Sequence, residues 1–121
     1  MCHSFVIEGK LPSLNEVINE NRSNRYAGAK LKKEIESLIG WAIKKAKLPH
    51  VEKPCVIEID WHEATKRRDV DNIQSSQKFI LDAMVKNGIL KNDSRRYVKQ
   101  IYHEVIDDDT NFVVVRIEEI I

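Results

Sequence analysis

The feature that most limits what this chain can fold into is an amphipathic pattern over residues 31–46. Apolar side chains recur there at helical spacing, opposite a face of lysine, glutamate and serine. A helix with one apolar face must bury that face against another layer of the structure. Such a layer follows in the sequence, because apolar residues at 56–61 alternate with Glu58 and Asp60 as they do in a β-strand.

The remaining segments predict an α/β fold in which helices cover a mixed β-sheet, in the order β-α-α-β-α-β-β. Residues 4–8 favour a short strand, and Ser13 is a good N-cap for a short helix that ends in a polar elbow at 21–24. A second major helix is expected from about Asp71 to Lys86, where Asn87-Gly88 is a helix-stop signal. Strands are expected at 97–105 and 112–117, joined by a solvated hairpin tip at 107–111.

Composition limits the size and location of the protein. With 121 residues, 42% of them hydrophobic, we expect a single domain over 1–121. No stretch approaches the roughly 20 apolar residues of a membrane span, and no secretory signal is visible, so we expect a soluble, cytoplasmic protein. Cys2 and Cys55 are too few for a disulfide framework or a structural zinc site. The formal net charge is only +1, so any binding of nucleic acid must be local.

The chemically informative stretch is Lys66-Arg67-Arg68-Asp69-Val70-Asp71-Asn72, followed by Lys78, Asp82 and Asp93. On one continuous helix from Asp71, four polar residues fall within about 60° of each other at 100° per residue. They are Asp71, Ser75, Lys78 and Asp82. The apolar residues of the same segment fall on the opposite side, so the polar stripe is expected to face a surface or cleft.

Carboxylates that lie close together repel one another unless a cation compensates them. Asp69 and Asp71 are two residues apart, so their side chains point the same way if the approach to the helix is extended. Oxygen ligands without cysteine or histidine favour Mg²⁺, with Mn²⁺ as the expected substitute. Lys66, Arg67 and Arg68 would then hold a polyanion whose phosphate the metal engages.

Structural explanations exist for each of these features. Asp69 and Asp71 are good N-cap and first-turn residues. From their spacing alone, helix capping explains them as well as a functional site does. Lys78 and Asp82 match an exposed i,i+4 ion pair. The cations at 66–68 match a solvated loop, and Asp93 matches a turn residue. The joint occurrence of these features favours the functional reading.

Three linked segments resemble the RusA family of Holliday-junction resolvases. They are Asp69-Val70-Asp71-Asn72, Lys78-Phe79-Ile80-Leu81-Asp82-Ala83-Met84 and Gly88-Ile89-Leu90-Lys91-Asn92-Asp93-Ser94. The likeness extends to the less specific segments Gly9-Lys10-Leu11-Pro12-Ser13-Leu14-Asn15 and 26–33.

The resemblance implies a Mg²⁺-dependent homodimeric endonuclease that cuts two strands of a four-way DNA junction symmetrically. Many members of the family are encoded by phages or prophages. By position, the metal-binding catalytic carboxylates would be Asp69, Asp71 and Asp93. The family's catalytic lysine follows the second aspartate by four residues, where this chain has Ser75, so about one helical turn is inserted before Lys78. The lysine-to-Asp82 spacing is kept.

Within this reading, Lys78 is expected to neutralise charge that develops in the transition state. Asn72 would orient a carboxylate by hydrogen bonding. The candidates for contacts to junction phosphates are Lys30, Lys33, Lys66, Arg67 and Arg68. Three alternatives remain open: a module that binds branched DNA without cutting it, a metal nuclease that acts on flaps, forks or single strands, and a protein-interaction domain built on the 31–46 helix.

Overall fold

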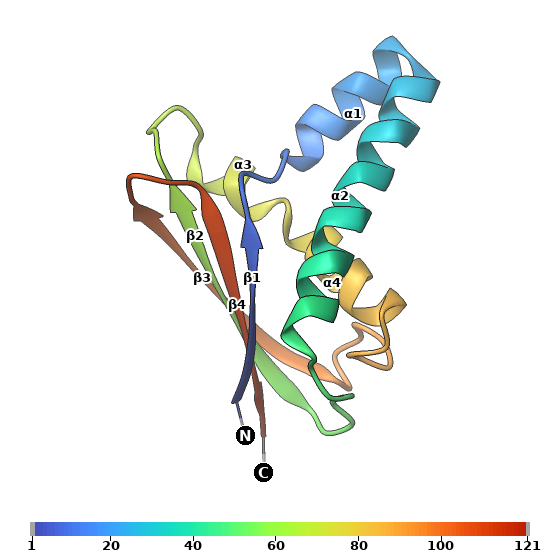
Figure 1. Ribbon diagram of the computed structural model, residues 1–121, viewed down its shortest axis with the longest axis vertical. Helices are drawn as coiled ribbons and strands as arrows, with labels where there is room; N and C mark the ends of the chain where they lie inside the picture. Colours follow the sequence, from blue (N-terminus) through green and yellow to red (C-terminus); the bar gives the residue numbers. More distant parts are fainter. Residues whose placement is uncertain (1, 121) are drawn as a thin grey trace.

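A computed structural model describes residues 2–120 as a four-stranded mixed sheet packed against helices (Figure 1). The strands are β1 (Cys2–Glu8), β2 (Cys55–Glu63), β3 (Val98–Asp107) and β4 (Phe112–Glu119), in the sheet order β1-β4-β2-β3. β4 pairs antiparallel with both β1 and β2, and β2 pairs parallel with β3. The predicted fold class and element order are confirmed, except that the second major helix is divided in two.

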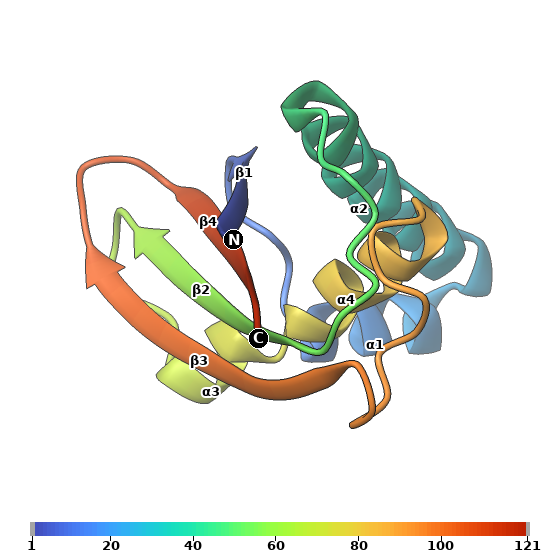
Figure 2. The same ribbon diagram turned by 90° about the horizontal axis from the view of Figure 1, so that it is seen from below.

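Four helices are present in residues 2–120: α1 (Leu14–Ser23), α2 (Arg25–Ala46), α3 (Val70–Gln74) and α4 (Gln77–Lys86). Figures 1 and 2 show α2 and α4 on one face of the sheet, with α1 folded back along α2. Ser13 caps α1 as predicted, since its Oγ accepts a hydrogen bond from the Glu16 amide. α2 begins six residues earlier than the apolar pattern indicated, because Asn24 Oδ1 caps it by accepting bonds from the amides of Tyr26 and Ala27.

The core lies between the sheet and the helices. Alternate residues of β2, from Cys55 through Ile57 and Ile59 to Trp61, are buried on the helical side, as the strand pattern predicted. Ile35, Ile39 and Ile43 of α2 and Phe79, Ile80 and Met84 of α4 complete this layer. The opposite face of the sheet carries polar pairs, chiefly the Arg116 guanidinium between Asp60 and Glu58 at 2.6 and 3.1 Å.

The predicted hairpin between the last two strands is wrong, because β2 lies between β3 and β4. The connection at 108–111 instead passes over the end of β2, where the Asp108 amide donates to the Glu63 carbonyl at 3.0 Å. Asn111 Oδ1 accepts from the Ala64 amide at 2.8 Å. β3 and β4 follow each other in the sequence, but each pairs with β2 rather than with the other. The residues of the connecting turn give no sign of this pairing. None of the helices in residues 2–120 is both long and apolar enough to cross a membrane.

Candidate nucleic-acid interface and acidic site

Asp69 and Asp71 lie at the start of α3, where the chain leaves β2. Asp69 occupies the N-cap position with extended backbone angles, yet its carboxylate makes no capping hydrogen bond. Both side chains are exposed, and neither forms an ion pair with another side chain of residues 2–120. Helix capping therefore does not account for Asp69. The two carboxylates are free to meet a ligand or a cation.

Arg68 immediately precedes this pair, but its guanidinium is turned inward. Nε and Nη2 donate to the two carboxylate oxygens of Glu63 at 3.1 and 2.9 Å, and Nη1 donates to the Leu11 carbonyl at 2.8 Å. Only 9% of the Arg68 side chain and 7% of the Glu63 side chain are exposed. The prediction that Arg68 contacts DNA phosphate does not suit this buried position, because each of its three guanidinium nitrogens already donates a hydrogen bond within the chain. Arg68 instead fixes the backbone that leads into Asp69.

A second set of hydrogen bonds fixes the far end of α3. Ser75 Oγ accepts from the Leu14 amide at 3.1 Å and donates to the Asn72 carbonyl at 2.6 Å. Ser76 Oγ, which is fully buried, donates to the Pro12 carbonyl at 2.7 Å. The Asn15 amide group donates to Asn72 Oδ1 at 3.3 Å. Asn72 thus contacts the segment at 11–15 rather than the carboxylates.

These contacts explain why the expected helix is divided. Ser75 and Ser76 form an elbow between α3 and α4, so residues 71–82 do not lie on one continuous helix. The prediction of a single polar stripe from Asp71 to Asp82 is therefore wrong. Ser75 occupies the position of the family lysine and makes only structural contacts.

Lys78 lies in the first turn of α4, beyond the elbow. Its side chain is 64% exposed, and Nζ is 3.9 Å from a carboxylate oxygen of Asp82. This is the exposed i,i+4 pair that the structural explanation predicted, and such a pair contributes at most about 1 kcal/mol. The ammonium group remains accessible to an anionic ligand.

Asp93 lies in the loop between α4 and β3. Its neighbour Asn92 accepts a hydrogen bond from the Ser94 amide at 2.9 Å, so the segment is a polar turn, as expected. Figure 1 shows α3 and this loop at opposite ends of α4. Among residues 2–120, no group of three or more histidine, cysteine, aspartate or glutamate side chains is arranged to hold a metal ion. A single chain therefore does not assemble Asp69, Asp71 and Asp93 into the predicted metal site.

The first residue of α4 is tied to the sheet through a histidine. Trp61 Nε1 donates to His103 Nδ1 at 2.9 Å, so Nε2 of the neutral ring carries the proton and donates to Gln77 Oε1 at 2.7 Å. Burial lowers the pKa of His103 below its usual value of 6.5. The sequence alone could not pair His103 with Gln77, which is 26 residues away.

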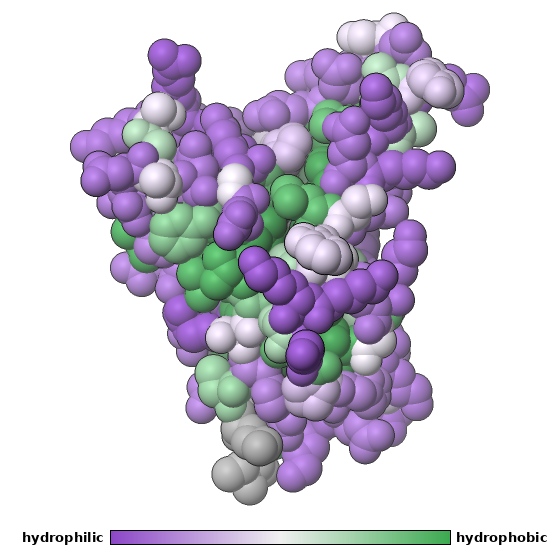
Figure 3. All heavy atoms as spheres, viewed as in Figure 1, coloured by the Kyte–Doolittle hydropathy of each residue, from purple (hydrophilic) through white to green (hydrophobic). Residues whose placement is uncertain are grey.

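The predicted phosphate-binding residues differ in their surroundings. Lys30, Lys33, Lys66 and Arg67 are exposed, and Lys66 is only loosely paired with Asp107 at 3.7 Å. Figure 3 shows a notch between two projecting arms, which are formed by α1 with the start of α2 and by the loops beyond the ends of β2 and β3. Both arms are largely hydrophilic, and α3 lies between them in this view. The exposed cations thus occur on both arms, with the acidic pair on the intervening helix.

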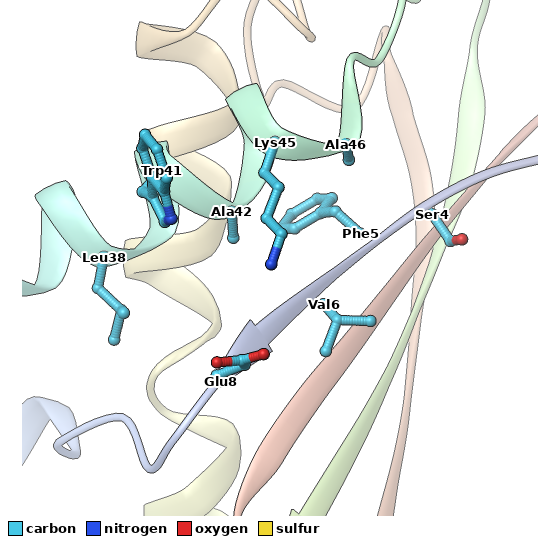
Figure 4. Close-up of a pocket in the computed structure, with 9 residues that line it drawn as sticks. All are labelled: Ser4, Phe5, Val6, Glu8, Leu38, Trp41, Ala42, Lys45 and Ala46. Carbon is cyan, nitrogen blue, oxygen red and sulfur yellow. The ribbon is translucent and has the colours of Figure 1, made fainter.

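A separate groove of about 340 Å³ lies between β1 and α2 (Figure 4). Phe5 and Val6 line one side, and Leu38, Trp41 and Ala42 line the other. None of the predicted site residues borders this groove. It is therefore not part of the acidic site.

Comparison with known proteins identifies the family. The model of the family described as "Endodeoxyribonuclease RusA" matches residues 9–118, which is nearly the whole chain. No curated protein matches the chain. The matched range includes the acidic pair, the elbow and the segment at 11–15 that holds them together. On this match, the chain belongs to the RusA endodeoxyribonuclease family.

Proposed function

We propose that the protein is an endonuclease that resolves four-way DNA junctions by paired, symmetric cuts, as a homodimer dependent on Mg²⁺ or, in its place, Mn²⁺. The observation that carries this proposal is the exposed pair Asp69 and Asp71. Within residues 2–120 these two carboxylates have no ion-pair partner, and the helix that carries them is held at both ends by part-buried hydrogen bonds. Membership of an endodeoxyribonuclease family supports a nuclease role for these carboxylates.

Different residues of the chain would bind DNA, stabilise charge during hydrolysis and position the aspartates. Lys66 and Arg67 on one arm and Lys30 and Lys33 on the other would contact backbone phosphates, which sets affinity and orientation without reading sequence. The accessible Lys78 ammonium would stabilise charge on the reacting phosphate. Arg68 and Asn72 are positioning residues, because they hold the segment that carries the aspartates.

The implied divalent cation does not fit the three aspartates of one chain as they stand. The dependence of cleavage on Mg²⁺ is proposed from the oxygen-only donor set and from the family.

The test is an endonuclease assay with a labelled synthetic four-way junction, set beside duplex, flap, fork and single-stranded DNA. The proposal expects cuts in the junction that require Mg²⁺ or Mn²⁺ and that are lost in Asp71→Asn while junction binding persists. Asp109→Asn is the matched control, because Asp109 is exposed and lies in the connection beyond β3. Preferential cutting of flaps or forks would contradict the assigned substrate.

A junction-binding module without cleavage is the second candidate. It is favoured by the structural role of Ser75 at the family lysine position and by the separation of Asp93 from the other aspartates. Tight junction binding with no cutting in either metal, by wild-type protein, would establish this alternative.

A further inference from the structure

The apolar groove of about 340 Å³ between β1 and α2 lies apart from the acidic pair (Figure 4). Three large apolar side chains that line it are exposed to solvent: Val6 by 49%, Leu38 by 37% and Trp41 by 68%. Figure 3 shows hydrophobic residues gathered between the sheet and α2 on this face. Apolar patches that stay exposed in this way mark interaction sites.

One wall of the groove is the free edge of the sheet. β1 is the first strand in the order β1-β4-β2-β3, and within residues 2–120 it pairs only with β4. Its other edge therefore presents backbone N–H and C=O groups without a strand partner, and such an edge accepts an additional strand. Proline, which would block pairing, is absent from Cys2–Glu8. Figure 2 shows this edge open beside α2.

The length of the groove suits a short extended segment. Residues 4–8 of β1 span about 14 Å along the strand, and residues 38–46 of α2 span about 12 Å along the helix. An extended chain covers this distance with about four residues. Alternate side chains of an added strand would point toward Leu38 and Trp41, where apolar groups would leave water.

The α2 wall of the groove is cationic. Lys45 lines the groove and extends from α2 toward β1 (Figure 4). Trp41 also lines a second hollow of about 460 Å³, together with three cations, Lys33, Lys44 and Lys86. Glu36 is the one carboxylate among the residues that line this hollow, and it is already paired with Lys86 at 3.2 Å. The charge around Trp41 therefore favours an occupant that carries carboxylates.

We propose that this groove binds an extended acidic and apolar segment of a partner protein, which adds to β1 as a fifth strand. The apolar residues of the segment would pack against Trp41, and its carboxylates would lie beside Lys45. This interaction is independent of the proposed nuclease activity, because none of the predicted site residues lines the groove.

The charges and the strand edge distinguish this occupant from two others. A second copy joined at β1 would bring its own cationic α2 wall to the same seam, so like charges would oppose each other. Single-stranded DNA would place phosphates beside Glu8, which lines the groove. DNA would also not match the N–H and C=O pattern of a strand edge, which a peptide backbone does.

Two peptide probes of seven residues, the length of β1, test the groove. They carry Val-Phe-Val-Ile with Glu-Asp-Glu either before or after it, because a strand adds in either direction. At least one unlabelled probe should shift the emission of Trp41 to shorter wavelengths in a saturable manner. Trp61 is 1% exposed and should contribute a constant signal. No shift with either probe would overturn the proposal.

Fluorescence anisotropy of a labelled probe measures what each side chain contributes. Trp41→Ala should weaken binding by about 30-fold or more, as for an aromatic residue at the centre of an interface. Lys45→Glu should weaken it by about tenfold and should favour a probe with lysines in place of the carboxylates. Lys32→Glu is the matched control, because Lys32 is exposed on the same helix but does not line the groove. Equal affinities of Lys45→Glu and Lys32→Glu would contradict the assigned charge of the partner.

N-methylation of the probe tests backbone pairing. Alternate amides of an added strand face β1, so methylation of one alternate pair of the four apolar residues should abolish binding. Methylation of the other pair should be tolerated, and equal tolerance of both would overturn strand addition. Displacement of the probe by an oligothymidylate would assign the groove to single-stranded DNA instead. A loss of dimer mass in light scattering when the probe binds would assign it to a second copy.

Discussion

At the scale of single residues, the basic run at 66–68 contains side chains with different roles. The sequence shows three adjacent cations and predicts one role for all of them. The structure separates them, because Arg68 lies between Glu63 on β2 and the Leu11 carbonyl, 57 residues away, whereas Lys66 and Arg67 are exposed. The choice of Asp69 and Asp71 as site residues came from their spacing and from the family resemblance, and it stays a prediction. The inward turn of Arg68 was not predictable, since it depends on a contact distant in the sequence.

A comparison of Arg68→Ala with Arg67→Ala tests this division. Arg68→Ala leaves the Glu63 carboxylate buried without a partner, which should lower the free energy of unfolding by about 3–5 kcal/mol in urea titrations. Arg67→Ala should change it by no more than about 0.5 kcal/mol. Arg67→Ala should instead flatten the salt dependence of junction binding by about one unit of slope. Equal stability of the two variants would contradict the division.

Lys78 provides the second prediction at this scale. Lys78→Ala should lower the junction-cutting rate by about 10²–10³-fold, as expected when a donor to a developing oxyanion is removed. Its stability should change by less than about 1 kcal/mol, because the pair with Asp82 is exposed. Single-turnover cleavage at saturating protein measures the rate, with Lys86→Ala as a control from the other end of α4. An unchanged rate would make Lys78 a surface residue only.

His103 gives a prediction about pH. Its pKa is lowered by burial, so between the folded pKa and 6.5 the unfolded chain binds a proton that the folded chain does not. This contribution to stability is complete above pH 6.5 and is lost as the pH falls through the folded pKa. The free energy of unfolding of the wild type should therefore fall more steeply from pH 7 to pH 5 than that of His103→Gln. Parallel curves from urea titrations would contradict this.

At the scale of elements, tertiary contacts decide boundaries that local patterns leave open. The apolar faces of α2, α4 and β2 were predictable, because burial follows the period of each element. The break between α3 and α4 was not, since Ser75 and Ser76 are tied to the chain at 12–14, about 60 residues earlier. The position of β4 between β1 and β2 could not be predicted from the sequence either. Strand pairing depends on contacts between distant segments, and the turn that joins two strands does not encode it.

The close approach of α1 and α2 gives the prediction at this scale. A Cβ on Gly28 would lie 2.6 Å from the Asn21 Cα atom, whereas a Cβ on Gly40 would meet Asn87 at an ordinary 3.5 Å. Gly28→Ala must separate the two helices and should destabilise the protein by about 1–3 kcal/mol despite its better helix propensity. Gly40→Ala should be neutral or stabilising by up to about 1 kcal/mol. Urea midpoints that move in the same direction would contradict this packing.

At the scale of the whole molecule, the candidate residues lie on separate elements of one chain. Exposed cations occur on both arms of the notch (Figures 1 and 3). The acidic pair lies at the start of the helix between these arms, and Asp93 lies in the loop between α4 and β3. The sequence predicted the candidate residues, but their separation in space depends on the fold. A four-way junction has twofold symmetry, so the proposed homodimer would present two equivalent sites to it.

Resolution of four-way junctions by paired, symmetric cuts is tested most directly by mapping the cuts that wild-type protein makes in Mg²⁺. The cuts are mapped at single-nucleotide resolution on both strand pairs of a four-way junction. We predict two nicks at symmetry-related positions in opposing strands, which leave two nicked duplexes, and no cuts in linear duplex of the same sequence. Cuts scattered along the arms, or equal cutting of the linear duplex, would contradict it.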